Sequence, residues 1–421
     1  MSTDIKMLMS DIGKRARAAE HFMAQADAET KNRALMAAAS AIRENSEDIK
    51  IANSIDMEAG KMKGLSKAML DRLMLDDKRI EAMAAGLEDI AGLSDPVGRI
   101  LSEWDRPNGL VIKRIAVPLG VIGIIYESRP NVTADAAALC LKSGNTVILR
   151  GGSESFNSSL TIMECLRKGI SDSNLPADSV QIVPVTDRDA VGVMLNMTEY
   201  IDVIVPRGGK SLISRIKEES RIPLFQHLEG ICHTYVHKDA DLEMARDVVF
   251  NAKLRRTGIC GATETLLVDH KVAGTHLPVI VNTLLEAGCE VRGDAITQLI
   301  DRRILSATEE DWHTEYLDAV ISVKVVDDVD DAVEHINKYG SRHTESIITE
   351  NKSVAEIFLK HCNSAIVLWN ASTQFADGGE FGMGAEIGIS TGRLHARGPI
   401  GVEQLCTFKY QVLGSGQIRP V

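Results

Sequence analysis

Residues 146–153, Thr-Val-Ile-Leu-Arg-Gly-Gly-Ser, contain a short apolar run followed, after one arginine, by a pair of glycines. Residues 203–211, Val-Ile-Val-Pro-Arg-Gly-Gly-Lys-Ser, repeat this arrangement. A short β-branched run bounded by glycine is typical of a buried strand that turns tightly into the next element. Helix-like stretches follow at 158–169 and 210–219. The two junctions therefore indicate parallel βαβ units, in which helices cover both faces of a sheet.

Further apolar runs extend this pattern along the chain. We predict strands at 121–125, 146–149, 180–183 and 203–205 in a first block, and at 234–236, 265–268, 320–326, 346–349 and 365–368 in a second. The first hundred residues instead show the spacing of amphipathic helices, with apolar side chains at Leu35, Ala38, Ala39, Ile42 and Ile49. The stretch from Gly378 is glycine-rich and irregular, and the tail at 407–413 can pair as an exposed strand.

Size and composition limit the possible functions. A chain of 421 residues suggests two or three domains, at roughly 100–200 residues each. The net charge of -12 argues against a nucleic-acid surface. The seven cysteines are an odd number and include no C-x-x-C pair, so a disulfide framework or cysteine-rich zinc site is not expected. No signal-like or membrane-length apolar run occurs, and we therefore expect a cytoplasmic protein that is not bound to a membrane.

The glycine-rich junctions are candidate phosphate-binding turns. Glycine lets backbone N–H groups approach a phosphate, and the following helix directs its positive end toward it. One such junction alone would more often be a tight turn, but two junctions that each carry an arginine favour a nucleotide. Neither matches G-x-G-x-x-G, and the second lacks the Walker glycine because residue 204 is Ile204. The sequence thus predicts a dinucleotide cleft of unorthodox type.

Cys260 is the candidate nucleophile. It lies in a loop of small residues between a helix expected to end near Arg256 and a strand beginning near Thr265. Two cationic residues, Arg255 and Arg256, directly precede this loop. Neighbouring cations favour the reactive thiolate. From this context alone, a nucleophile and a small buried turn residue are equally good interpretations.

Two further groups of polar residues have competing explanations. Asn131 follows the first predicted strand, where its amide could stabilise an oxyanion or, as the local context favours, cap the next helix. Cys232, His233 and His237 suggest a metal site. Residues i and i+4 of a strand are about 13 Å apart, however, which is too far for one tetrahedral site.

These segments resemble a known family. The similarity runs from Gly120 almost to the C-terminus and is carried by residues 121–133, 141–152, 206–212, 230–233, 260, 264–268, 339–344, 370–384 and 386–401. They are similar to the γ-glutamyl phosphate reductases, a branch of the aldehyde dehydrogenase superfamily. The first hundred residues match more loosely.

The resemblance implies an aldehyde dehydrogenase-like α/β fold with a Rossmann-like NADP-binding domain, an α/β catalytic domain and a small β oligomerisation element. The implied ranges are 1–106, 121–233 and 369–388 for the first, 234–368 for the second, and 107–120 with 389–421 for the third. The implied reaction is NADPH-dependent reduction of L-glutamyl 5-phosphate to L-glutamate 5-semialdehyde, the second step of proline biosynthesis. Such a protein would be a homo-oligomer that can associate with glutamate 5-kinase.

The resemblance also implies roles for individual residues. Cys260 would form a thioester, and Asn131 with the Cys260 backbone N–H would bind the oxyanion. The cofactor would be held by Arg150, Gly151, Gly152, Ser153, Glu154, Arg207, Gly208, Gly209 and Glu380, with Arg150 favouring a 2′-phosphate and hence NADPH. No metal is implied.

Departures from the family leave alternatives. Gly261 stands where the family commonly has asparagine, and His227-Leu228-Glu229 lies where members vary. Phosphate leaves without needing a proton, so we expect that Glu229 is not a general base. A hydrolytic aldehyde dehydrogenase for another small aldehyde is the nearest alternative. A Cys260–His233 hydrolase or a non-catalytic binding protein would not need a nicotinamide cofactor.

Overall fold

The computed structural model describes residues 3–225 and 229–419, and it contains two compact units. Unit 1 spans Met1–Gln226, Gly382–Gly388 and Ile400–Val421, and unit 2 spans His227–Phe381 and Ile389–Pro399. Which unit has the cofactor-binding role and which the catalytic role stays a prediction, as do the domain ranges given above.

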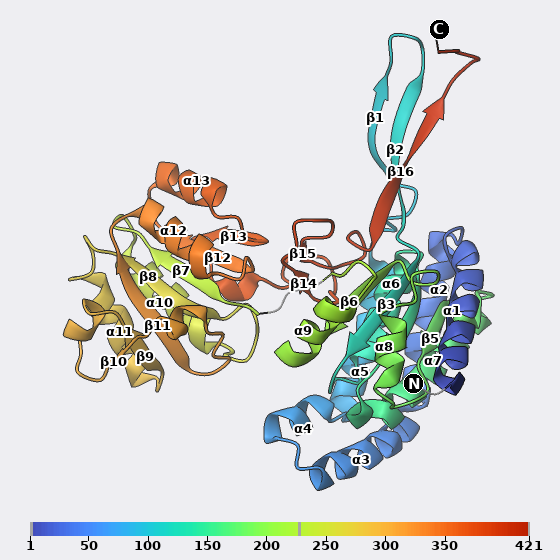
Figure 1. Cartoon of the computed structure of the whole chain (residues 1–421), viewed down its shortest axis with the longest axis horizontal. Coiled ribbons are helices and arrows are strands. Elements are labelled where there is room, and N and C mark those ends of the chain that lie inside the picture. Colours follow the sequence, from blue (N-terminus) through green and yellow to red (C-terminus); the bar gives the residue numbers. More distant parts are fainter. Residues whose placement is uncertain (1–2, 226–228, 420–421) are drawn as a thin grey trace. The chain divides into compact units, whose positions relative to one another are not determined.

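Unit 1 combines an N-terminal set of helices, a parallel sheet and a separate antiparallel sheet (Figure 1). Its helices are α1 (Thr3–Met23), α2 (Ala28–Glu44), α3 (Ser46–Met62), α4 (Lys67–Leu73), α5 (Asp77–Gly92), α6 (Val132–Lys142), α7 (Phe156–Asp172), α8 (Asp189–Met194) and α9 (Lys210–Glu219). Its strands are β1 (Ile100–Asp105), β2 (Val111–Pro118), β3 (Val121–Tyr126), β4 (Thr146–Arg150), β5 (Val180–Ile182), β6 (Val203–Arg207) and β16 (Cys406–Leu413). Short 3-10 turns occupy Ser153–Ser155 and Ala177–Ser179.

The amphipathic pattern of the first hundred residues folds as predicted. Asp27 caps α2 by accepting the Thr30 N–H at 2.7 Å. The predicted core side chains Leu35, Ala38, Ala39, Ile42 and Ile49 are fully buried. The helices pack closely because Gly169 of α7 has no side chain. A Cβ there would meet the backbone of Ala38 in α2.

The parallel sheet of unit 1 has the order β5-β4-β3-β6. Every residue of β3 and β4 is buried, as the continuous apolar runs predicted. Ile148 of β4 joins a core with helices α1, α8 and α9, while α6 and α7 contact the same sheet. β3, which comes first in the sequence among these four strands, is thus flanked by β4 on one side and by β6 on the other. This is the strand order at which a doubly wound sheet opens a crevice at its carboxyl edge.

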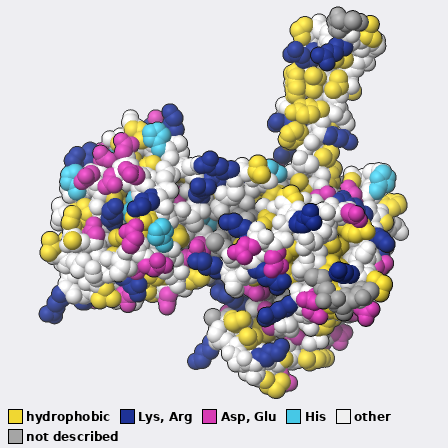
Figure 2. Space-filling view, in the orientation of Figure 1, with side chains coloured by type: hydrophobic (Ala, Val, Ile, Leu, Met, Phe, Trp, Pro, Cys, Tyr) yellow, Lys and Arg dark blue, Asp and Glu magenta, His cyan; other side chains and the backbone are white. Residues whose placement is uncertain are grey.

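A three-stranded antiparallel sheet of order β1-β2-β16 extends from the rest of unit 1 and is called the arm here (Figure 1). The C-terminal strand pairs along β2 from Cys406 opposite Pro118 to Leu413 opposite Val111. Figure 2 shows hydrophobic side chains on the arm. Trp104, Phe408 and Tyr410 are among its exposed aromatic residues.

Unit 2 is built around a seven-stranded sheet of order β10-β9-β11-β8-β7-β12-β13, and every neighbouring pair is parallel. The strands of this sheet are β7 (Cys232–Val236), β8 (Thr263–Asp269), β9 (Glu290–Gly293), β10 (Leu305–Ser306), β11 (Val320–Val326), β12 (Thr344–Ile348) and β13 (Ile366–Trp369). Unit 2 also contains a separate antiparallel ladder of β14 (Ile389–Ser390) and β15 (Gly398–Pro399). The helices are α10 (Leu242–Leu254), α11 (His276–Glu286), α12 (Val329–Tyr339) and α13 (Lys352–His361), and further 3-10 turns occupy Thr297–Leu299, Glu310–His313 and Thr373–Phe375.

Both faces of this sheet are covered. Leu266 of β8 packs in a core with α10 and α11, while the next residue, Leu267, packs in a core with α12 and α13. Successive side chains of a strand point to opposite faces, so both must be apolar here. This explains the apolar run at residues 266–268, at the centre of β8.

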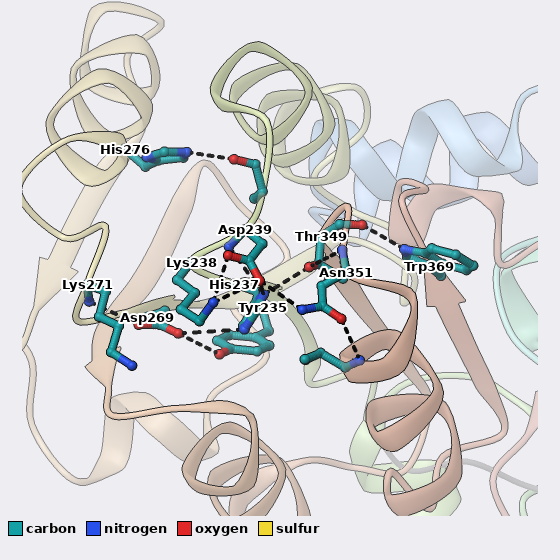
Figure 3. Close-up of polar contacts among 12 residues, drawn as sticks. Tyr235, His237, Lys238, Asp239, Asp269, Lys271, His276, Thr349, Asn351 and Trp369 are labelled. Atoms are coloured by element: carbon teal, nitrogen blue, oxygen red, sulfur yellow. Dashed lines mark hydrogen bonds and ion pairs between the residues drawn. The ribbon is translucent and has the colours of Figure 1, made fainter.

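A polar network closes the carboxyl ends of β7, β8 and β12 (Figure 3). His237 Nδ1 lies 2.9 Å from Thr349 Oγ1, and the Trp369 indole donates to the Thr349 carbonyl at 2.8 Å. Asn351 donates to Asp239 at 2.9 Å. Because these groups bond to one another, the network ties the strand ends together.

The predicted strands all occur, with bounds shifted by a few residues at most. One helix end was wrong by two residues: α10 ends at Leu254 and not near Arg256. Within the described residues, no helix is long and apolar enough to cross a membrane.

Candidate active site

Cys260 lies in the loop between α10 and β8, at the amino-terminal edge of the unit 2 sheet. The Ala262 N–H donates to the Ile259 carbonyl at 3.0 Å and closes the turn around it. All seven cysteines fall within the described residues, and six of them are buried while Cys260 is half-buried. Burial raises the pKa of Cys232 well above its usual range, so the Cys232 thiol stays protonated. Cys260 is thus the thiol that a small molecule can reach.

Two residues of the segment Gly230-Ile-Cys-His233 hold the Cys260 backbone. The Cys232 thiol donates to the Cys260 carbonyl oxygen at 3.0 Å. A Cβ on Gly230 would lie 2.7 Å from Cys260 Cα and 2.8 Å from its carbonyl carbon, so only glycine fits. Gly230 is itself held by Glu315, which accepts its N–H at 2.9 Å. His227 and Leu228, just before this segment, lie outside the described residues.

Gly261 has a steric explanation. A Cβ at this position would approach the Thr373 carbonyl oxygen to 3.1 Å and Ala376 Cβ to 3.6 Å. A side chain at this position would require the 3-10 turn Thr373–Phe375, against which the loop packs, to shift by a few tenths of an ångström. The departure from asparagine therefore matches a close approach of this turn to the nucleophile loop.

The two arginines before Cys260 do not contact its thiol. Arg255 is exposed and donates to the Gln374 side chain at 3.2 Å. Gln374 in turn donates to the Arg256 carbonyl at 3.1 Å, while the Arg256 side chain is exposed. Among the described residues, no hydrogen bond joins either guanidinium to the sulfur of Cys260. Their proximity in sequence does not become a contact in the fold.

His233 is engaged elsewhere. Its Nδ1 lies 2.9 Å from Glu345 Oε2, and both side chains are fully buried. No hydrogen bond links it to Cys260 in the part of the chain that the structure describes. The histidine near this loop is His343, whose Nδ1 lies 3.6 Å from the Cys232 sulfur and whose pKa burial lowers to about 4. The geometry therefore does not support a Cys260–His233 pair.

Asn131 occupies the N-cap position directly before α6 in unit 1, but its side chain does not cap the helix. Its side chain makes no cap hydrogen bond, so the capping alternative is wrong. The amide instead donates to Asp135 Oδ2 at 2.9 Å. Burial raises the pKa of Asp135 to about 6, and the hydrogen bond from Asn131 opposes that shift. One Asn131 amide hydrogen is thereby committed, and the other makes no hydrogen bond to any of the described residues.

The first glycine-rich junction lies at the carboxyl end of β4. The Arg150 guanidinium is buried and donates to the carbonyls of Gly151 and Thr186, the latter at 3.0 Å. Glu154 accepts the Ser128 N–H at 2.8 Å and its hydroxyl at 2.7 Å, and so links this junction to the loop before Asn131. These contacts give Arg150 a role in shaping the junction, while its expected contact with a 2′-phosphate stays a prediction.

The second junction lies at the carboxyl end of β6 and is closed by Glu127. Its Oε2 accepts the Gly209 N–H at 2.9 Å, and it lies where a Cβ on Gly208 would be. Arg207 packs against Gly388, whose φ of 157° and missing side chain leave space for the guanidinium. The predicted cofactor residues at both junctions thus gather at one edge of the unit 1 sheet. Glu380 is exposed and belongs to unit 2.

Several of these partners were not predicted. Glu127, Asp135 and Cys232 all fix a predicted site residue, and only Asp135 has a local signal. It follows Asn131 by four residues, a spacing that places two side chains on one face of a helix.

Comparison with known proteins places the chain in a family. A sequence model described as the aldehyde dehydrogenase family matches residues 6–294. The chain belongs to the aldehyde dehydrogenase family. It is 70% identical to a γ-glutamyl phosphate reductase of Paramagnetospirillum magneticum, over 100% of this chain and 99% of the relative. It is 61% identical to the same enzyme of Rhodospirillum rubrum, over 99% of this chain and 98% of the relative.

A solved structure supports the same grouping. The crystal structure of the γ-glutamyl phosphate reductase of Thermotoga maritima matches with a TM-score of 0.96 and 46% identity, and it covers 98% of this chain and 100% of that one. The family resemblance and the aldehyde dehydrogenase-like α/β fold that the sequence predicted are therefore confirmed.

Proposed function

We propose that the chain catalyses the NADPH-dependent reduction of L-glutamyl 5-phosphate to L-glutamate 5-semialdehyde and phosphate, the second step of proline biosynthesis. The proposal is supported by full-length similarity to γ-glutamyl phosphate reductases at 70% and 61% identity. The structural observation that carries it is the single half-buried thiol, Cys260, in a loop fixed by Gly230 and Cys232.

The residues have the following roles in this proposal. The Cys260 thiolate attacks the acyl carbon, and the carbonyl oxygen becomes anionic. The Cys260 N–H and the uncommitted amide hydrogen of Asn131 stabilise that charge, which is worth about 2.7–4 kcal/mol for each such donor. The C–O bond to phosphate then breaks with its electron pair on phosphate, leaving a thioester on Cys260. Asp135 keeps Asn131 oriented throughout.

The carboxyl edge of the unit 1 sheet fits a dinucleotide. Strand order places the crevice of a doubly wound sheet between β3 and β6, and both glycine-rich junctions end at this edge. Arg150, Gly151, Gly152, Ser153 and Glu154 would hold one part of the cofactor. Arg207, Gly208 and Gly209 would hold another, and Glu380 is proposed as a further contact. When bound, the reduced nicotinamide supplies the hydride that converts the thioester to the aldehyde.

We extend the proposal to assembly and location. The arm exposes Trp104, Phe408 and Tyr410 on short antiparallel strands, and β16 has a free edge. Exposed apolar strands of this kind are suited to pairing with another chain. A second copy of this chain is the proposed occupant, with glutamate 5-kinase as a further associated protein. Free thiols at all seven cysteines fit a cytoplasmic location.

The decisive experiment follows NADP⁺ reduction with glutamate semialdehyde, with and without phosphate, for the wild type and Cys260→Ala. We expect oxidation that depends on phosphate and is abolished by the substitution. Oxidation independent of phosphate would indicate the hydrolytic alternative, and Glu229→Gln would then show whether Glu229 activates water. Full activity of Cys260→Ala would refute the proposed mechanism.

A further inference from the structure

Three arginines of unit 2 lie close enough for the charges of two of them to act on the third, near the segment that leads into β13. They are Arg342, Arg393 and Arg397, called the arginine cluster here. Arg397 donates from Nη1 to Asn363 Oδ1 at 2.9 Å and from Nη2 to the Asn363 carbonyl at 2.6 Å. The Arg342 carbonyl accepts the Ala365 N–H at 2.9 Å, so Arg342 and Arg397 both lie against the segment that leads into β13. Arg393 belongs to the connection between β14 and β15, which also carries Arg397.

The cluster gathers positive charge without counter-charge. Among the described residues, none of the three side chains forms an ion pair with a carboxylate. Glu345, which accepts the Ser364 hydroxyl at 2.9 Å, is buried and paired with His233. Burial first, and then the charges of Arg393 and Arg342, lower the pKa of the Arg397 guanidinium. Like charges held together in this way are stabilised when an anion binds them.

Two details distinguish the cluster from arginines scattered over a surface. The Nε of Arg397 is buried and has no hydrogen-bond partner within the part of the chain that the structure describes. Arg342 has a φ of 63°, in the left-handed region that residues other than glycine rarely adopt. Such strained backbone is concentrated at ligand-binding sites.

The cluster is connected to the nucleophile through one apolar group of residues. Ile366, Ala376 and Ile389 form that group, and Cys260 and Ala365 pack against it. Ala365 lies two residues after Asn363, and Ile389 begins the ladder whose connection carries Arg393 and Arg397. The arginine cluster therefore adjoins the apolar group on which Cys260 rests, within the same unit.

We propose that the arginine cluster is the site that receives the phosphate group of the acyl phosphate, and from which free phosphate leaves. The inference rests on the proposed function. The substrate also has an α-carboxylate, but that group carries an ammonium on the same carbon, which three uncompensated cations would repel. Phosphate has a charge of about −1.5 to −2 near neutral pH and no cationic neighbour. When the C–O bond breaks, the electron pair moves onto phosphate, and the guanidiniums stabilise that charge.

The roles within the cluster differ. Both Nη groups of Arg397 are committed to Asn363, so this residue adds charge and positions the segment before β13. Arg342 and Arg393 are exposed, and their planar guanidinium groups match phosphate oxygens in a bidentate manner. These two are therefore the residues to substitute first.

The test compares Arg393→Gln and Arg342→Gln with the wild type in the oxidative direction. Phosphate and semialdehyde concentrations are varied separately. We expect the KM for phosphate to rise roughly tenfold or more in each variant, because a hydrogen bond to a charged group is lost. The KM for semialdehyde should stay near the wild-type value. Arg302→Gln is the matched control, since Arg302 is also an exposed arginine of unit 2 but precedes β10, at the opposite edge of the sheet from β13.

A second readout needs no turnover. Inorganic phosphate should slow the alkylation of Cys260 by iodoacetamide in the wild type and in Arg302→Gln, and much less in the two cluster variants. An unchanged KM for phosphate with unchanged protection would overturn the proposal. A rise in the KM for semialdehyde alone would also overturn it and assign the cluster to the α-carboxylate. If wild-type oxidation were independent of phosphate, the proposed function would fail, and the alkylation result would still decide whether the cluster binds an anion.

Discussion

Replacing Gly230 with alanine would place a methyl carbon 2.7 Å from Cys260 Cα and 2.8 Å from its carbonyl carbon. Non-bonded carbons normally lie about 3.5–4.0 Å apart, so the two backbones must separate by about 1 Å. A displacement of this size at a reacting group costs about 100-fold in rate. Overpacking of this kind should also lower the free energy of unfolding by about 1–3 kcal/mol.

The assay measures kcat for phosphate-dependent oxidation of semialdehyde, the alkylation rate of Cys260 and the melting temperature. We expect a kcat lowered by about two orders of magnitude, because the backbone N–H of Cys260 and its thiol both move. Gly274→Ala is the control, since a Cβ on Gly274 meets no atom within 4 Å. Wild-type kcat and alkylation in Gly230→Ala would refute the reasoning that this glycine sets the position of the nucleophile.

Three other predictions follow from buried charge and from the arm. Lys253→Ala should destabilise the protein by about 3–5 kcal/mol, because it removes the ammonium group that lies 2.5 Å from the buried Glu264 carboxylate. Denaturant unfolding measures this loss, and an unchanged midpoint would contradict it. Since burial lowers the pKa of His343 from 6.5 to about 4, its contribution to stability is present above pH 6.5 and is lost as the pH falls through 4. Melting temperatures between pH 7 and pH 4 should therefore fall less for His343→Gln than for the wild type, and parallel curves would exclude this group. Tyr410→Lys should shift the assembly toward smaller species in sedimentation without changing the melting curve at the lowest concentrations, whereas an unchanged distribution would remove the arm from the interface.

Several of the strands that were predicted from the sequence share one physical property. β3, β4 and β8 are buried along their whole length, and each contains a short apolar run, as at residues 147–149 in β4 and 266–268 in β8, that can be read from the sequence. β1 has the opposite property. Five of its six residues are exposed, and its sequence Ile-Leu-Ser-Glu-Trp-Asp carries neither a continuous nor an alternating apolar pattern. Of the arm, only the C-terminal strand was predicted from the sequence, as the tail at 407–413 that can pair as an exposed strand, and an oligomerisation element as a whole was expected only from the resemblance.

Some residues of the candidate site could likewise be predicted from the sequence, and others could not. Cys260 was identified because a thiol among small residues is a local feature of the sequence. The groups that fix the predicted site residues are not local: Cys232, which holds the Cys260 backbone, is 28 residues away from it, and Glu127 bonds to Gly209 across 82 residues. Only a folded sheet brings such residues together. The same limit applies to Arg255 and Arg256, whose closeness in sequence predicted a contact that the fold does not make.

The route of the chain between the two units bears on how the protein is made. The sheet of unit 2 is complete once Trp369 has been synthesised, so it can form while the remainder is still on the ribosome. Unit 1 begins with α1 but needs β16, which ends at Leu413, to pair the last strand of the arm. During translation, one edge of β2 would therefore stay unpaired until Leu413 emerges. Nascent chains stalled before residue 406 should accordingly be the ones that require a chaperone.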